Sequence, residues 1–511
     1  MSQVESPSDA PLKGGALVLA GLMLASANFV AVLDTTIANV SVPNIAGALG
    51  ASSSQGTYVI TSYAVAEAIT VPLTGWLAAR FGTVRVFVLS LLMFGLCSAL
   101  CGLANSMGML VIFRVLQGLA GGPLMPLSQT LLLRIFPKEK APAAIGLWSM
   151  TTLVAPVVGP ILGGVICDRL HWSYIFFINV PVAVICSWFA FRLLRRYETA
   201  LLRQRMDKVG LALLVVWVGA LQIMLDEGKD LDWFASTEIV VLAIVAVIGF
   251  LSFLIWETTE RHPIVDLHVF RHRGFSASVL TISLAFGAFF GNTVLTPLWL
   301  QDYMGYTATW SGCATAMTGV LAVLVAPIAA NMASRFDGRW LVFAGVLWMG
   351  VVTLARAHSD TDMTFWQVSI PLMLLGLGLP FFFVPLTGLA LSSVEESETA
   401  SAAGLMNFCR TLSGAIATAL VNTMWEDRIK ISHAQLADIV DTSHHYLNAL
   451  KDSGMSLGLA RAEINNMVQT QAVMLATAQL FAIAGVTFVL AAAAVWLAPK
   501  PTRVADTSHA H

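Results

Sequence analysis

The sequence has few charged residues. Only 11% of its 511 residues are Asp, Glu, Lys or Arg, whereas 57% are hydrophobic and the mean hydropathy is +0.77. A soluble core of this length uses far fewer apolar residues, so the composition predicts an all-α, polytopic protein embedded in the lipid bilayer. The net charge of −2, with no strongly basic domain, argues against nucleic acid as a partner.

The sequence also lacks the motifs of enzymes and ATP-driven pumps. Its six cysteines lie in or at the ends of apolar runs without metal-ligand spacing, which predicts inert apolar residues, no disulfide framework and no metal site. The sole Gly-Lys pair, Gly228-Lys229, is followed by Asp230, so no Walker-type loop exists. No His-Glu or Ser-His-Asp grouping gathers at a predicted membrane face. We therefore expect no catalytic residues and no cofactor, and a non-transporting sensor or scaffold is the alternative outside transport.

Long apolar windows are abundant. Fourteen are long enough to span a bilayer, at about residues 16–40, 57–78, 86–104, 109–133, 142–166, 172–192, 209–225, 237–256, 275–298, 309–331, 340–356, 367–391, 402–424 and 472–497. An even number places both termini on one side. With that side in the cytoplasm, nineteen of the 28 Lys and Arg residues fall inside, seven fall outside and two lie in the membrane. The positive-inside rule supports this orientation.

A short internal echo suggests two related halves. The run Ala78 to Gly82 is similar to Ala333 to Asp337, and each lies in a short basic turn between two spans. Two six-helix halves with an inserted pair of helices are a transporter architecture. The predicted organisation is a cytoplasmic N-terminus at 1–15, a first half at 16–192, a basic connector with two inserted helices at 193–274, a second half at 275–498 and a cytoplasmic tail at 499–511. The second half includes a long outer segment at 426–471, expected to be a solvated loop or a docking surface for a partner.

Two of the four strongly ionisable side chains within the spans lie at a similar depth. Asp34 is six residues beyond the middle of the first span, and Arg114 is seven residues outward of the middle of the fourth. Both offsets amount to roughly 9 to 10 Å by the helical rise. Pairing would offset much of the desolvation cost of each charge. We therefore expect Asp34 to contact Arg114, directly or through Gln117, water or a neighbour.

The other two charges are nearer the bilayer midplane. Glu67 lies at the centre of the second span, where burial favours the protonated carboxyl group, so it can carry a proton or attract a cationic substrate. Alternatively it stays protonated and makes one hydrogen bond, for example to Asn28. Arg410, in the thirteenth span, either binds an anionic group of a substrate or bonds helix carbonyls in a structural role.

Five stretches carry a family resemblance. They are Leu33 to Pro43, Arg114 with Gln117-Gly118, Ala155 to Gly164, Trp172 to Pro181 and Leu221 to Trp233. In these stretches the chain resembles the major facilitator superfamily, in particular its fourteen-spanner drug:proton antiporters of the EmrB/QacA type, and most closely the EmrB-like exporters of Gram-negative bacteria. The similarity covers nearly the whole chain.

The resemblance implies a major facilitator fold in the bacterial inner membrane. It further implies export of amphipathic toxic drugs driven by the proton gradient, together with a periplasmic adaptor and an outer-membrane channel as separate polypeptides. We expect Asp34, Glu67 and Arg114 to couple proton movement to alternating access. The alternative is a proton symporter that imports a metabolite, which the glycine-proline pattern of the fifth span disfavours.

Further residues are expected to act in gating and substrate binding. The loop with Gly75, Arg80 and Gly82 is similar to the gating motif of the family, although Ala79 stands where an Asp is common, so the usual charge relay is not supported there. The antiporter motif of the fifth span comprises Pro156, Gly159, Pro160, Gly163 and Gly164. Flexible and aromatic side chains accept varied apolar ligands. The residues expected on the substrate side, which could also be packing filler, are Glu67, Arg410, Asn292, Asn407, Phe286, Phe290, Met317, Phe382 and Met406.

Overall fold

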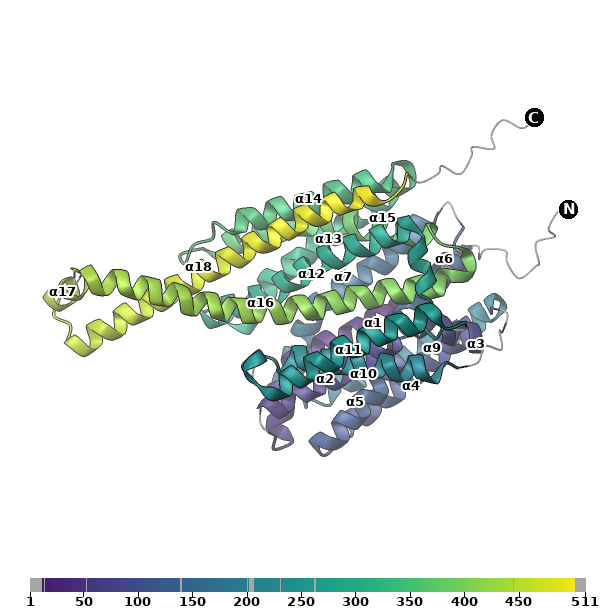
Figure 1. Cartoon of the computed structure of the whole chain (residues 1–511), viewed down its shortest axis with the longest axis horizontal. Coiled ribbons are helices and arrows are strands. Elements are labelled where there is room, and N and C mark those ends of the chain that lie inside the picture. The colour runs from purple at the N-terminus through teal and green to yellow at the C-terminus, as the bar shows by residue number, and fades with distance from the viewer. Residues whose placement is uncertain are drawn as a thin grey trace.

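The structure, a computed structural model, describes residue 12 and residues 14–500 apart from 52, 138–139, 200, 202–205, 230, 262 and 444. Over this part of the chain every regular element is a helix, as the composition predicts (Figure 1). The predicted tail and most of the predicted N-terminus lie outside the described residues, as does part of the basic connector.

The first half of the chain forms nine helices. They are α1 (Gly14–Ala48), α2 (Ser53–Thr70), α3 (Thr74–Phe81), α4 (Thr83–Gly102), α5 (Met107–Gly121), α6 (Leu124–Ile135), α7 (Ala141–Arg169), α8 (Tyr174–Phe177) and α9 (Asn179–Leu194). Three predicted spans are each built from two helices. Ile178 separates α8 from α9, Pro72 separates α2 from α3, and Pro123 separates α5 from α6. Proline lacks the backbone N–H that a continuous helix needs.

The inserted pair and the second half follow. The inserted helices are α10 (Lys208–Glu227) and α11 (Thr237–Thr259), and the second half contains α12 (Arg273–Asp302), α13 (Ala308–Arg335), α14 (Gly338–Arg356), α15 (Phe365–Ser392), α16 (Thr399–Ser443), α17 (His445–Asp452) and α18 (Leu457–Ala494). Short 3-10 helices are η2 (Arg195–Tyr197), η3 (Trp233–Ala235), η4 (Leu267–Arg271), η5 (Glu396–Glu398) and η6 (Val495–Leu497).

Each of the fourteen predicted windows is covered by helix. Within the described residues, 12 helical segments are long and apolar enough to cross a membrane, and a bent pair within α7 makes 13. The two parts of α7, Ala143–Pro156 and Ile161–Cys167, differ in direction by 42°. The remaining window is covered by α2 and α3, whose polar side chains, including Glu67, lower their hydropathy.

The bundle has two distinct ends. Leu12 donates a backbone hydrogen bond to Ile135 at the end of α6, and the Arg339 guanidinium, at the start of α14, donates to the carbonyl of Ala498. We call this the terminal end, because both described chain ends lie there. At the opposite end, α16 and α18 continue well beyond the other helices to α17 (Figure 1). The predicted outer segment 426–471 is therefore a helical hairpin rather than an irregular loop.

The two halves meet near the terminal end. In α7, a Cβ added at Gly146 would lie 3.2 Å from the Cβ of Ala330 in α13. On the other side of the bundle, the Asn407 side chain of α16 donates a hydrogen bond of 3.1 Å to Gln129 of α6. Gly75 in α3 also packs directly on Ser401 of α16. These contacts close the bundle at its terminal end.

The inserted helices pack beside this junction. Of the two, α10 contacts α2 of the first half and α16 of the second half, and α11 packs against α10. At the hairpin end, Lys229 forms an ion pair of 2.7 Å with Glu426, and Trp233 donates to Thr423. The inserted pair is therefore tied to the helix that continues into the hairpin.

Candidate functional site

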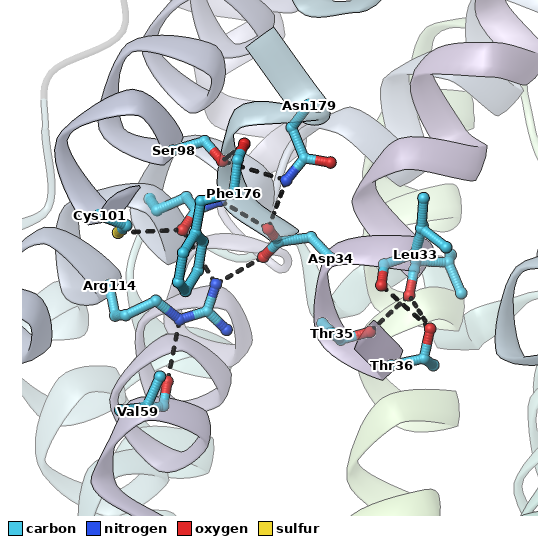
Figure 2. A network of polar contacts seen from close by, with 12 residues as sticks. Leu33, Asp34, Thr35, Thr36, Val59, Ser98, Cys101, Arg114, Phe176 and Asn179 are labelled. Carbon is cyan, nitrogen blue, oxygen red and sulfur yellow. Dashed lines mark hydrogen bonds and ion pairs between the residues drawn. The ribbon is translucent and has the colours of Figure 1, made fainter. Parts of the chain in front are cut away.

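The Asp34 carboxylate lies inside the first half and is fully buried. Its Oδ2 atom accepts a hydrogen bond of 2.5 Å from Nη1 of Arg114, so the expected contact is direct. Its Oδ1 atom accepts from the side-chain amides of Gln117, at 2.9 Å, and Asn179, at 2.6 Å (Figure 2). Three donors from α5 and α9 therefore surround one carboxylate of α1.

Arg114 is held at several points. Besides Asp34, its Nη1 atom donates to Oε1 of Gln117 at 2.9 Å, and its Nε atom donates to the Val59 carbonyl of α2 at 2.9 Å. The ring of Phe176 lies on another side, 5.6 Å from the guanidinium carbon. The arginine side chain is as deeply buried as Asp34, which means that bulk water screens neither charge.

A second layer of hydrogen bonds fixes the donors. Asn179 also donates to the Ser98 hydroxyl of α4, which in turn donates to the carbonyl of Phe176 (Figure 2). The Cys101 thiol lies 3.5 Å from Oε1 of Gln117. This thiol is free and buried, and it borders the network instead of being only apolar filler.

The antiporter motif places α1 against this network. A Cβ at Gly159 would lie 2.8 Å from the Cβ of Thr36, and one at Gly163 would lie 3.0 Å from the carbonyl of Ile37. Both glycines therefore permit the close approach of α1 and α7 one turn from Asp34. Nothing lies within 4 Å of a Cβ added at Gly164. Pro156 ends the first part of the bent helix, and the side chain of Pro160 is outside the described set.

Glu67 lies on α2 and is partly exposed. Tyr63 lies one turn earlier on the same helix face, and its ring packs against Arg114, the partner of Asp34. The suggested bond to Asn28 is not made, because the Asn28 amide donates to the hydroxyls of Thr151 and Thr152 instead.

Arg410 reaches from α16 towards the first half. Its Nη2 atom contacts the sulfur of Met125, and its guanidinium carbon lies 5.5 Å from the Trp148 ring and 5.3 Å from the Phe286 ring. Its Nε atom is buried without a hydrogen-bond partner among the described residues. The cation is thus enclosed by soft and aromatic groups at the boundary between the halves.

The other residues expected on the substrate side differ in burial. Phe286 and Phe290 stack at 5.4 Å and are half-buried, as is Met317. Phe382 and Met406 are fully buried in the largest apolar cluster. Both asparagines are buried and donate within their own helices, Asn292 to Ala288 and Asn407 to Ala403.

The loop motif between α3 and α4 is contacted by the carboxylate of Glu198, a residue outside the motif. Gly82 has φ +93°, which favours glycine, and it separates α3, whose last turn carries Arg80, from α4. Glu198, far along the sequence, accepts hydrogen bonds from the backbone N–H groups of Val84 and Arg85 at 3.0 and 3.1 Å. A carboxylate at a helix N-terminus is favoured by the dipole, so Glu198 supplies a negative charge in a motif that carries Ala79.

The arrangement can transfer a proton and change packing at the same time. Protonation of Asp34 would neutralise one member of a buried pair and weaken its bonds to Arg114 and Asn179. Because these partners belong to α5 and α9, the contacts among three helices would change together.

Several residues of the network escaped the sequence analysis. Asn179, Ser98, Cys101 and Tyr63 are neutral and lie in apolar runs, so neither charge nor depth marks them. The recurrence of Val59, Tyr63 and Glu67 every four residues was a usable signal, because it places all three on one face of α2.

Known proteins resemble this chain over almost its full length. It is 44% identical to the multidrug export protein EmrB of Escherichia coli (strain K12), over 96% of this chain and 97% of the relative. It is 42% identical to the fatty acid resistance protein FarB of Neisseria gonorrhoeae, over 98% and 99%. It is also 29% identical to the colistin resistance protein EmrB of Acinetobacter baumannii, over 78% of each chain.

Solved structures share the fold. The proton:xylose symporter XylE superposes with a TM-score of 0.60 at 14% identity, covering 95% of this chain and 96% of the symporter. Residues 24–418 match the Major Facilitator Superfamily, a range that contains Asp34, Arg114 and Arg410. With 12 to 13 membrane-length apolar helices among its described residues, this chain is a multi-pass membrane transporter that belongs to the major facilitator superfamily.

Proposed function

We propose that the protein exports amphipathic toxic compounds by alternating access, driven by the proton gradient. The observation that carries the proposal is the pair of Asp34 and Arg114, two charges buried inside a membrane bundle where only function or pairing makes them tolerable. The relatives named as multidrug export and fatty acid resistance proteins support export of apolar, often charged compounds.

In this proposal the acids of the first half take up and release protons. Arg114 pairs with Asp34, and Glu67 lies on α2, which contacts α16, the helix that carries Arg410. A substrate between the halves would meet both signs of charge and the aromatic surface of Phe286 and Phe290. An anionic compound would favour Arg410, whereas a cationic one would favour Glu67.

The orientation follows from the distribution of Lys and Arg. Nineteen of 28 basic residues lie in the segments assigned to the side of the termini. We therefore place the terminal end in the cytoplasm of a bacterium, with the protein in its inner membrane. The contacts between the halves at this end would then close the cytoplasmic entrance, so the structure represents one of the two alternating states.

The helical hairpin of α16, α17 and α18 is proposed to meet a periplasmic adaptor, which joins an outer-membrane channel. It extends beyond the bundle and exposes apolar side chains such as Ile439, Leu459 and Met467. Adaptor and channel would be separate polypeptides. Removing the outer segment 426–471 should abolish drug resistance in cells while leaving transport by the purified protein intact.

Transport by the purified protein tests the function. Proteoliposomes with an imposed pH gradient are loaded with anionic or cationic fluorescent probes, and both probe and proton fluxes are followed. Export predicts that probe and protons move in opposite directions. Movement in the same direction would instead support the symporter, and no flux with any probe would contradict a transport role.

A further inference from the structure

Tyr63 lies between the two acidic sites of the first half. Val59, Tyr63 and Glu67 follow one face of α2 at intervals of four residues. Arg114 donates to the Val59 carbonyl, and its guanidinium carbon lies 4.2 Å from the centre of the Tyr63 ring. The cation that pairs with Asp34 therefore also covers the tyrosine, and the next turn of α2 carries Glu67.

The Tyr63 hydroxyl is a buried donor without a hydrogen bond of good geometry. The side chain is only 1% exposed, and its oxygen has no such partner among the described residues. Glu67 lies four residues further along the same helix, at the spacing that makes side chains neighbours on one face. A buried hydroxyl without a partner is unfavourable, so a small approach of Glu67 would stabilise both groups.

Glycines of α5 make room for this side chain. A Cβ at Gly121 would lie 2.6 Å from the Tyr63 hydroxyl oxygen, and one at Gly118 would meet the Tyr63 carbonyl. At Gly122, a Cβ would lie 3.1 Å from the carbonyl oxygen of Glu67. Any larger residue at these positions would move the tyrosine or its neighbour, so the glycines fix the position of Tyr63 as well as the spacing of two helices.

We propose that Tyr63 is a positioning residue that links the Asp34–Arg114 pair to Glu67, so that a change of charge at one acid alters the protonation of the other. Its ring contacts the arginine, and the second carboxyl group lies one turn further on the same face of the helix. The proposal rests on the proton coupling of the proposed function, but the link itself can be measured without transport.

The charged groups around Tyr63 and Glu67 come from four other helices. Asp34 belongs to α1 and Arg114 to α5, and Arg410 approaches Glu67 from α16. From α10, Asp226 contacts Thr61, which points away from Tyr63 because it lies two residues earlier on the helix. Tyr63 is therefore the group that lies between Arg114 and Glu67 on α2.

The test is an infrared titration of the full-length protein in detergent. The absorption of the protonated Glu67 carboxyl is identified by its loss in Glu67→Gln and is followed against pH in the wild type and in Tyr63→Phe. The phenylalanine keeps the ring over Arg114 and removes only the hydroxyl. Loss of a donor to the ionised carboxylate should move the midpoint by about one unit to higher pH. Tyr58→Phe, an exposed position on the same helix, should leave it unchanged.

Two further measurements separate the possible outcomes. Gly121→Ala should shift the midpoint in the same direction, because the added methyl group displaces the hydroxyl. If the midpoint moves in Tyr63→Phe while the wild type shows no gradient-driven efflux, the proposed function fails and the link stands. A Glu67 band that titrates at the same pH in both proteins, or does not titrate, overturns the link.

Discussion

Asp34 is stable inside the bundle because all its neighbours donate to it. Arg114, Gln117 and Asn179 each bond one of its oxygens, and none of the four side chains has measurable contact with solvent. A buried pair of this kind costs several kcal/mol to desolvate and is often no more stabilising than apolar packing. Stability alone therefore does not account for it, and this is why we propose that the charge of Asp34 changes reversibly during transport.

The sequence predicts the charged members of this site and Gln117, but not Asn179 or Tyr63. Helical rise places Asp34 and Arg114 at one depth, and their contact follows from the cost of unpaired charge. Asn179 is different, because its role depends on the packing of α9 against α1 and α4, which no local pattern reports. Tyr63 was missed for the same reason.

Glu67 gives a prediction at the scale of one residue. Replacement by Gln removes a negative charge and preserves shape, so export of cationic probes should fall at least about tenfold, the effect of losing about 1.4 kcal/mol of attraction. Export of anionic probes should be retained. The measurement is the rate of dye movement in everted vesicles, with Glu463→Gln on the exposed face of the hairpin as control. Equal losses for both classes of dye would contradict a role in charge selection.

At the scale of the helices, the sequence predicts the spanning helices but not the extension of α16 beyond the bundle. All fourteen windows are helical, because hydropathy and length suffice for a spanning helix. The breaks near Pro72 and Pro123 follow from proline chemistry. The extension of α16 to Ser443 was not predicted, because its polar outer part lacks a hydropathy signal and its helical state depends on packing against α18.

The start of α14 gives a prediction about pH. Asp337 caps the helix and pairs with Arg339 at 2.8 Å, and hydrogen bonding from Arg339 holds the pKa of Asp337 below its ordinary value. A carboxyl whose pKa is lower in the folded protein contributes stability above its unfolded pKa, about 4, and loses it as pH falls through the folded value.

Asp337→Asn keeps the cap but removes this charge. It should reduce stability at pH 7 by about 1 kcal/mol, a hydrogen bond to a charged group discounted for partial exposure. The difference from the wild type should vanish as pH falls through the lowered pKa of Asp337. Thermal unfolding in detergent across pH measures this, with the exposed Asp362→Asn as control. If Asp337→Asn remained less stable than the wild type at acidic pH, the lost charge of Asp337 would not be the cause of the lower stability.

At the scale of the molecule, the helices assigned to the two halves and to the inserted pair are present, and their division into these units stays a prediction. The contacts between the halves were not predicted. Here the halves meet at the terminal end through pairs such as Gly146 with Ala330 and Gln129 with Asn407. No single residue pattern predicts these contacts, because they join segments far apart in the sequence. Under the proposed alternating access they would form and break during transport.

A disulfide between the halves tests this movement. In a chain whose six native cysteines are replaced, Gly146→Cys with Ala330→Cys would place two Cβ atoms near the separation that a disulfide needs. Oxidation should reduce efflux to background, and a reductant should restore it. The control is Gly287→Cys with Ala417→Cys, two positions within one half. A Cβ at Gly287 would lie 3.6 Å from the Cβ of Ala417, so this pair should cross-link without loss of transport. Full activity of the oxidised cross-half pair would show that this contact need not open.

The proposed proton-driven export depends on a proton that binds to and leaves Asp34. The most direct measurement is uptake of a probe by everted vesicles or proteoliposomes under an imposed pH gradient, for the wild type and for Asp34→Asn, whose side chain has the same size but no titratable group. The account predicts that the variant inserts, folds and binds the probe, and that its gradient-driven transport falls to the level of empty vesicles. Transport by Asp34→Asn at the wild-type rate, still responding to the gradient, would contradict it.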